Sequence, residues 1–120
     1  MSTIKFSIQT EPVPFKRTSY NGKRRYNDSR YTDFKFYVGL HAKAAMNGRA
    51  PLDGAIKINI CIYTKFEPTA LNAGDWDNHA KSVSDALNGI CFNDDRQIVE
   101  GHVYLFKGTP RIEVELEELT

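Results

Sequence analysis

Ala55-Ile-Lys-Ile-Asn-Ile-Cys-Ile-Tyr-Thr64 is the stretch that decides the fold, because isoleucine occupies every second position from 56 to 62. Successive side chains of a β-strand point to opposite faces of the sheet. The isoleucines therefore share one face, while the intervening Lys, Asn, Cys and Tyr share the other. The stretch predicts a strand that buries one face against a hydrophobic core.

Further elements flank this strand on both sides. Before it, apolar alternation over residues 4–8 predicts a strand, and apolar residues at helical spacing predict a helix over about 29–47. After it, a shorter helix is predicted over about 77–88, and two strands over 99–105 and 112–116. The order strand, helix, strand, helix, strand, strand predicts an α/β fold of the α+β type. We expect one small mixed sheet of about four strands, covered by two helices.

Length and composition narrow the class of protein. A chain of 120 residues, 41% hydrophobic and 26% charged, is expected to form a single domain over residues 1–120. The formal net charge of +1 speaks against a uniformly basic protein that coats nucleic acid. No apolar run approaches the ~20 residues that cross a bilayer, and the start of the chain lacks the apolar region of a secretory signal. We therefore expect a cytoplasmic protein with no membrane partner, in which Cys61 and Cys91 are reduced core thiols.

Five of the fifteen acidic residues gather between positions 75 and 95. In extended chain that leads into the second helix, Asp75 and Asp77 point to the same side. The short connection after that helix is expected to return the chain and place Asp94 and Asp95 beside them. Clustered carboxylates repel each other unless a cation neutralises them, and hard oxygen ligands suit Mg²⁺ or Mn²⁺. Asp75, Asp77, Asp94 and Asp95 are therefore candidate metal ligands for the hydrolysis of a phosphodiester.

Lys81 shares a helix face with Asp77 and Asp85, because these residues are spaced four apart. Beside a metal site, this lysine would contact a phosphate oxygen or orient a water molecule. Simpler roles stay open: an aspartate before the helix could cap it, the later pair could form a solvated turn, and Lys81 could make only surface ion pairs. His79 and His102 are expected to be structural or exposed rather than ligands or bases.

A basic segment precedes the first predicted helix. Six cations and one acid give residues 16–30 a charge of +5, which leaves −4 for the rest of the chain. Cations contact phosphates, and the aromatic residues interleaved with them can stack on exposed bases. The segment is therefore a candidate DNA-binding surface, with a solvated loop as the alternative. Its basic residues are Lys16, Arg17, Lys23, Arg24, Arg25 and Arg30.

Three closely spaced motifs run from residue 75 to residue 99. The pattern D-x-D-N-x-x-K is met by residues 75–81, D-A-L by residues 85–87, and D-D-x-Q-[IV]-V by residues 94–99. Together they resemble the RusA family of Holliday junction resolvases, and the resemblance covers essentially the whole chain. It departs from some relatives at Asn72-Ala73-Gly74, where those relatives have arginines.

The resemblance implies a bacterial or phage-encoded endonuclease that uses Mg²⁺, with Mn²⁺ as a possible substitute. The implied substrate is a four-way DNA junction in recombination and repair, and the implied assembly is a homodimer. Asp75, Asp77 and Asp95 match the family's essential metal-binding aspartates, Lys81 matches its catalytic lysine, and Asp94 matches the first acid of the pair. A two-fold dimer presents two identical sites, as two symmetric cuts require. A non-catalytic DNA-binding module and a nuclease for other branched DNA are the alternative functions.

Overall fold

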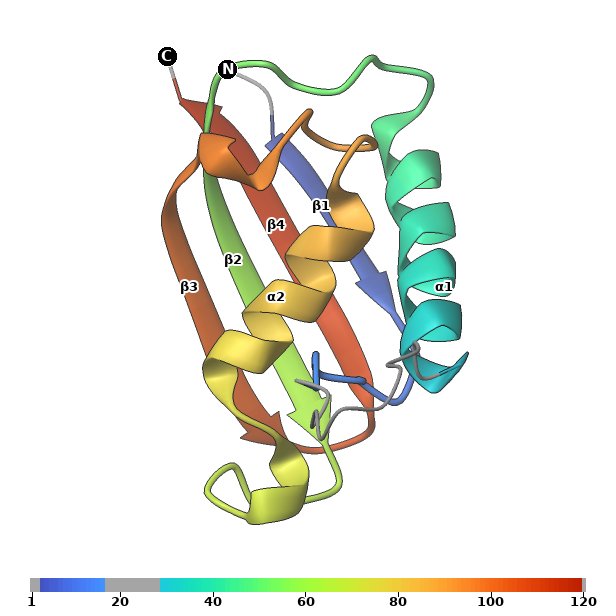
Figure 1. Ribbon diagram of the computed structural model, residues 1–120, viewed down its shortest axis with the longest axis vertical. Helices are drawn as coiled ribbons and strands as arrows, with labels where there is room; N and C mark the ends of the chain where they lie inside the picture. The colour runs from blue at the N-terminus through green and yellow to red at the C-terminus, as the bar shows by residue number, and fades with distance from the viewer. Residues whose placement is uncertain (1–2, 17–28, 120) are drawn as a thin grey trace, which may run out of the picture.

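The computed structural model describes residues 3–16 and 29–119. Its elements follow the predicted order, and each α-helix begins and ends within one residue of the expected position (Figure 1). The strands are β1 (Thr3–Ile8), β2 (Ala55–Thr64), β3 (Ile98–Lys107) and β4 (Arg111–Leu119). The α-helices are α1 (Ser29–Met46) and α2 (Trp76–Leu87), and the 3-10 turns are η1 (Leu71–Ala73) and η2 (Asp95–Gln97).

The four strands form one mixed sheet in the order β1-β4-β2-β3. β2 runs parallel to β3, whereas β4 runs antiparallel to both β1 and β2. The register places Ile58 of β2 between Gly101 of β3 and Leu116 of β4. The predicted α+β fold, with a mixed sheet of four strands and two helices, is confirmed. A parallel neighbour requires a crossover, and α2 supplies it between β2 and β3.

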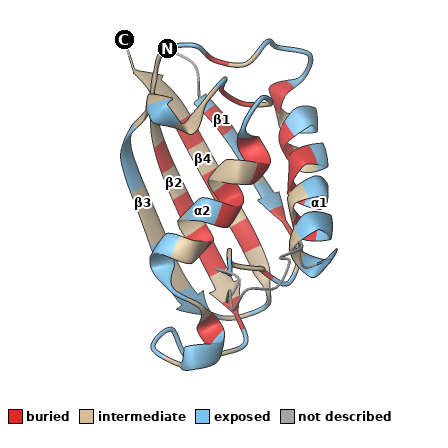
Figure 2. Cartoon of the chain, viewed as in Figure 1, coloured by how far each residue is buried: buried red, intermediate tan, exposed pale blue. Residues whose placement is uncertain are grey.

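The core lies between the sheet and the two helices, which cover the same face of the sheet (Figure 1). The alternating isoleucines of β2 are all at most 3% exposed, as the sequence pattern predicted. They meet the buried stripe of each helix, including Val38 of α1 and Val83 and Leu87 of α2, each 0% exposed (Figure 2). Burying one branched aliphatic side chain contributes about 1.5–3 kcal/mol, so this layer carries much of the stability.

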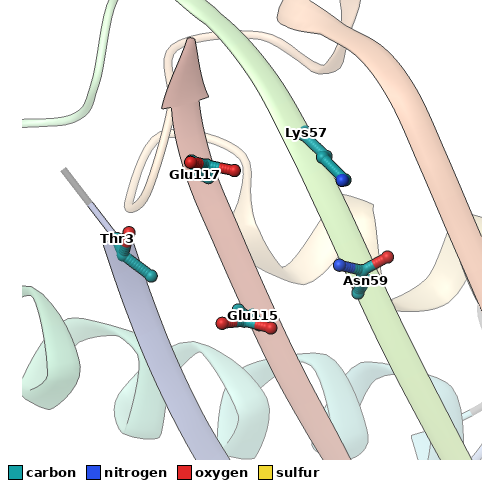
Figure 3. Close-up of a pocket in the computed structure, with 5 residues that line it drawn as sticks. All are labelled: Thr3, Lys57, Asn59, Glu115 and Glu117. Carbon is teal, nitrogen blue, oxygen red and sulfur yellow. The ribbon is translucent and has the colours of Figure 1, made fainter. Parts of the chain in front are cut away.

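The opposite face of the sheet carries mostly polar side chains, with a row of aromatic rings toward the end of β3, and is not covered by either described helix. It carries a small pocket of about 190 Å³ lined by residues of β1, β2 and β4, which Figure 3 shows. The lining residues are Thr3, Lys57, Asn59, Glu115 and Glu117. Cys61 lies on this face and is only partly buried, so the expectation of a core thiol is correct for Cys91 and wrong for Cys61. Both thiols are free.

The crossover helix α2 runs from one end of the sheet to the other. The candidate residues before it and after it therefore lie at opposite ends. β2 ends at Thr64, beside the end of β3, and the chain then reaches the start of α2 at the same end (Figure 1). α2 runs back along the sheet for twelve residues, roughly 18 Å, before the chain enters β3 at the opposite end. No helix in the described part of the chain is long and apolar enough to span a membrane.

Candidate metal and DNA site

The first turn of α2 presents two aspartates to solvent. Asp75 is the N-cap residue, with extended backbone at φ −85° and ψ 148°, yet its side chain makes no capping hydrogen bond. Asp77 lies in the first helical turn, and both residues are exposed. With Trp76 and with Leu105 of β3, they line an open depression of about 680 Å³. The carboxylate of Asp75 therefore does not cap the helix, although Asp at this position usually does.

A buried histidine fixes the turn on which Asp75 stands. His79 is 1% exposed, and its Nε2–H donates to the carbonyl oxygen of Ala73 at 2.7 Å. Gly74 is required here, because its φ is +83° and a Cβ would lie 2.8 Å from His79 Nε2 and 2.9 Å from Pro14 Cγ. Burial lowers the pKa of His79, so the neutral ring is favoured. His79 is thus structural, as predicted.

Lys81 is held in a polar network on the outer face of α2. Its Nζ donates to both carboxylate oxygens of Asp85 at 3.0 Å, and it lies 5.5 Å from the centre of the Phe15 ring. The hydroxyl of Tyr31 on α1 donates to the same carboxylate at 3.1 Å. Burial, followed by the negative charge of Asp85, raises the pKa of Tyr31, so the hydroxyl keeps its proton. The ion pair considered from the sequence is present, and Tyr31 is an unexpected third member.

Asp94 and Asp95 do not join Asp75 and Asp77 within one chain. They lie at the start of β3, whereas the other two lie at the start of α2, and these points are at opposite ends of the sheet (Figure 1). Among residues 3–16 and 29–119, no three Asp, Glu, His or Cys side chains come together as a possible metal site. The expectation that the short connection after α2 returns the chain to its start is wrong. That connection instead leads into a parallel strand, which must begin at the far end.

Asp94 caps the turn η2. Its Oδ1 accepts the backbone N–H of Arg96 at 2.9 Å, and its Oδ2 lies 3.3 Å from Arg96 Nε. The hydrogen bond from the Arg96 backbone is the main reason that the pKa of Asp94 is lowered. The turn role considered from the sequence therefore fits Asp94. Asp95, the next residue, is half-buried.

Gln97 anchors the turn that carries these two acids, and the sequence reasoning assigned it no role. Its Oε1 accepts the backbone N–H groups of Asn93 at 2.8 Å and Asp94 at 3.0 Å. Its Nε2 donates to the carbonyl oxygens of Leu52 and Gly54, both at 2.9 Å. All four contacts of this side chain are to backbone, so Gln97 fixes the position of η2. A glutamine three residues after an aspartate is a capping-box signal that could have revealed this role.

The basic segment begins and ends beside Lys81. The rings of Phe15 and Tyr31, which flank it, meet edge to face with centroids 5.7 Å apart. The Phe15 N–H also donates to the carbonyl oxygen of Asn78 on α2 at 2.9 Å. Of the six predicted DNA-binding cations, Lys16 and Arg30 are described and exposed. The others lie outside the described residues: Arg17, Lys23, Arg24 and Arg25.

Comparison with known proteins adds two findings. The family model described as endodeoxyribonuclease RusA matches residues 9–117. The chain is also 30% identical, over 144 aligned residues, to the uncharacterized protein YqaN of Bacillus subtilis strain 168, and this alignment covers 100% of the chain and 99% of the relative. The family match includes α2, η2 and the basic segment. This chain therefore belongs to the RusA family of endodeoxyribonucleases.

Proposed function

We propose that this protein is a Mg²⁺-dependent endonuclease that resolves four-way DNA junctions by two symmetric cuts. Family membership supports endonuclease activity. The observation that carries the rest is the pair Asp75 and Asp77, which stand exposed at one open depression, the former without a capping bond. Two exposed carboxylates at a helix start, followed by a lysine one turn later, are suited to a cation and a phosphate.

One chain supplies two carboxylates, those of Asp75 and Asp77, as ligands for a divalent cation. Mg²⁺ commonly binds through one or two carboxylates together with a substrate phosphate, and Asp75 and Asp77 can supply the two carboxylates. Mn²⁺ prefers the same hard oxygen ligands. When bound, such an ion would supply Lewis-acid activation of the phosphodiester and of a water molecule. Both aspartates also need positioning, which His79 and Gly74 provide through the turn before α2.

Lys81 is proposed to contact the scissile phosphate and stabilise the charge that develops there. The Lys81 side chain is about half exposed, so DNA can reach it, and Asp85 holds it on the face of α2 that also carries Asp77. Tyr31 in turn holds the Asp85 carboxylate by its hydroxyl. Asp85 and Tyr31 are therefore positioning residues that act through Lys81. The basic residues of segment 16–30 would hold the DNA backbone, because both ends of the segment lie beside this lysine.

A homodimer is proposed for two reasons. One chain offers one pair of helix-start aspartates, so two symmetric cuts need two copies. In addition, Asp95 is too far from Asp75 and Asp77 to act with them in the same chain. A second copy in the opposite direction would bring its own Asp95 to the start of α2, and two-fold symmetry would do the same at the other site. Asp94 would accompany it, although its cap already occupies one of its oxygens.

The choice of substrate is tested by comparing branched and linear DNA. Purified protein is incubated with a four-way junction, a fork and a linear duplex, each with Mg²⁺ or with EDTA. We expect paired nicks at symmetric positions in the junction only, and only with the metal. Preferred cutting of the fork would instead favour a nuclease for other branched DNA. Binding without cutting would favour a DNA-binding module, in which the acids have the structural roles seen for Asp94 and Asp85.

The basic segment gives a prediction about salt. We expect the double variant Arg24→Ala/Arg25→Ala to bind a four-way junction more weakly, because a protein that neutralises fewer phosphates releases fewer counterions on binding. The slope of log K against log salt should become shallower by about 0.9 for each phosphate that is no longer neutralised. Fluorescence anisotropy at four or five salt concentrations measures the slope. The control is Lys5→Ala/Lys43→Ala, two exposed lysines outside the segment. An unchanged slope in the arginine variant would show that these arginines do not contact phosphates.

The Tyr31 hydroxyl gives a prediction about the rate of cutting. Tyr31→Phe keeps the ring against Phe15 but removes the hydrogen bond to Asp85, so Lys81 is held less firmly. We expect kcat to fall roughly three- to tenfold, which corresponds to about one hydrogen bond, with KM unchanged. Tyr37→Phe on the same helix is the control and should leave kcat unchanged. A fall in the melting temperature without any change in kcat would show that Tyr31 is only structural.

A further inference from the structure

We propose that Trp76 stacks on a nucleobase that is exposed where the DNA duplex is interrupted, and that this contact selects branched DNA over linear duplex. The inference rests on the proposed function for a branch point as the source of that base. Trp76 is the only tryptophan of the chain and the first residue of α2. It stands between Asp75 and Asp77 in the sequence, and all three line the same depression. The ring is therefore next to the carboxylates that are proposed to act on the phosphodiester.

The Trp76 side chain is exposed to an unusual extent for its type. Tryptophan is highly buried on average because its ring is a large apolar surface, yet Trp76 is 63% exposed. It is not one of the residues that form the hydrophobic core. Among the described residues, the indole also stacks on no other ring. A large aromatic surface left open beside a site indicates that a ligand covers it.

The backbone holds this ring in a fixed place. Gly74, at φ +83°, and the buried ring of His79 fix the turn that leads into α2. The segment between β2 and α2 extends past the ends of the strands, so this part of the chain protrudes from the sheet (Figure 1). Leu71, at the start of η1, is 95% exposed and lines the same depression as Trp76. The two side chains thus present an apolar surface on a backbone that is already ordered before a ligand binds.

The chemistry of the depression favours the face of a base over other parts of DNA. Membership of an endodeoxyribonuclease family makes DNA the expected ligand. Phosphates are repelled by Asp75 and Asp77 unless a cation lies between them. The face of a base is an uncharged π surface, and aromatic side chains stack on every kind of base. Trp76 is therefore suited to stack on a nucleobase, with Leu71 as an apolar wedge beside it.

Stacking on Trp76 distinguishes branched from linear DNA, because the faces of the bases are hidden in an intact duplex. Only the edges of the bases are accessible through its grooves. A ring that enters between stacked base pairs must pay the cost of unstacking them. That cost is lowest for a base that is already unpaired or unstacked. The contact therefore adds affinity for DNA with exposed base faces and adds little for a linear duplex.

A second aromatic group of the chain is less suited to this role. On the open face of the sheet, the rings of Tyr63 and Phe106 stack with centroids 4.9 Å apart, so each covers one face of the other. The same sheet face carries Glu113, Glu115 and Glu117 of β4, opposite the outward residues of β2. Three carboxylates on one strand repel a DNA backbone. Trp76 is thus the better candidate for contact with a base.

The first test uses the fluorescence of Trp76, to which no other tryptophan contributes. The full chain is titrated in EDTA, which prevents cutting, with a four-way junction, a single strand of thymidine nucleotides or a linear duplex. We expect the junction and the single strand to quench the emission, because a stacked base quenches an excited indole, and the saturating duplex to leave it nearly unchanged. Equal quenching by the duplex, or quenching by none of the three, overturns the inference. Quenching by the single strand alone overturns the assignment to a branch point.

The second test measures binding by variants of this residue. Trp76→Ala removes the ring and Trp76→Phe keeps a smaller one, while Phe36→Ala on α1 is the control, since Phe36 is 69% exposed outside the depression. Fluorescence anisotropy of labelled DNA gives the Kd for the junction and for the duplex. We expect Trp76→Ala to lose affinity for the junction roughly 5- to 150-fold, the range for one base stacked on an aromatic ring, with duplex binding unchanged. Trp76→Phe should keep most of the affinity, and Phe36→Ala should keep all of it.

An unchanged ratio of junction to duplex affinity in Trp76→Ala overturns the inference. Circular dichroism checks that each variant is folded, and the emission of the wild type gives an answer that needs no variant. Both tests are independent of cutting. A protein that stacks a junction base on Trp76 but does not nick the junction with Mg²⁺ supports the inference and refutes the nuclease proposal. A protein that nicks the junction, and whose Trp76→Ala variant keeps the full preference for it, does the reverse.

Discussion

Asp75→Asn is expected to abolish cleavage of a four-way junction while leaving binding intact or stronger. The amide keeps the size of the side chain but removes the negative charge that a divalent cation requires. The rate should fall by at least about 100-fold, the scale on which one preorganised electrostatic group acts. Binding should not weaken, because Asp75 is exposed beside the proposed DNA surface and its charge repels phosphates. Single-turnover cleavage and binding titrations measure the two quantities.

The control for this variant is Asp33→Asn, which removes the same charge from an exposed position on α1. It should cut at the wild-type rate. Because the Asp75 side chain makes no capping hydrogen bond, Asp75→Asn should also melt at nearly the wild-type temperature. Cutting at the wild-type rate by Asp75→Asn would disprove the proposed role of this aspartate. Loss of binding together with cutting would assign it to the fold instead.

The fold could be predicted because its signals are local. Alternating isoleucines in β2 specify one buried face, and the helix ends follow from apolar spacing that stops at glycine. The order of strands in the sheet was not predicted, since it depends on pairing between distant segments. The parallel pairing of β2 with β3 in particular is not encoded in any short stretch. It follows only once α2 is known to be a crossover.

The spatial arrangement of the candidate site could not be predicted from the sequence. The motifs identified Asp75, Asp77, Lys81 and Asp95, but the assumption that neighbours in sequence meet in space failed for the last of these. The reason is that α2 spans the sheet between them. Tyr31 was missed for a related reason, since its contact with Asp85 joins residues on two helices far apart in the sequence. Long-range contacts of this kind leave no periodic signal in a single sequence.

Mixing two inactive variants is expected to restore cleavage, because the acids of one site are proposed to come from two copies. Asp75→Asn and Asp95→Asn should each be inactive as homodimers. In a heterodimer of the two, one site contains both substitutions. The other site combines wild-type Asp75 and Asp77 of the Asp95→Asn chain with wild-type Asp95 of the Asp75→Asn chain. Co-expression with two different affinity tags allows this heterodimer to be purified, and a nicking assay on a labelled junction measures the result.

The heterodimer should nick one strand at about half the wild-type total rate and should rarely complete the paired cut, because only one of its two sites is intact. A heterodimer of Asp75→Asn with Asp77→Asn is the matched control. Asp75 and Asp77 of one chain line the same site. In the control, one site therefore lacks the carboxylate of Asp75 and the other lacks that of Asp77, so no cleavage returns. If each chain instead formed its own complete site, the first heterodimer would also stay inactive, because every chain in it carries a substitution. Recovery in the first pair and not in the second is therefore expected only when Asp95 acts across the dimer.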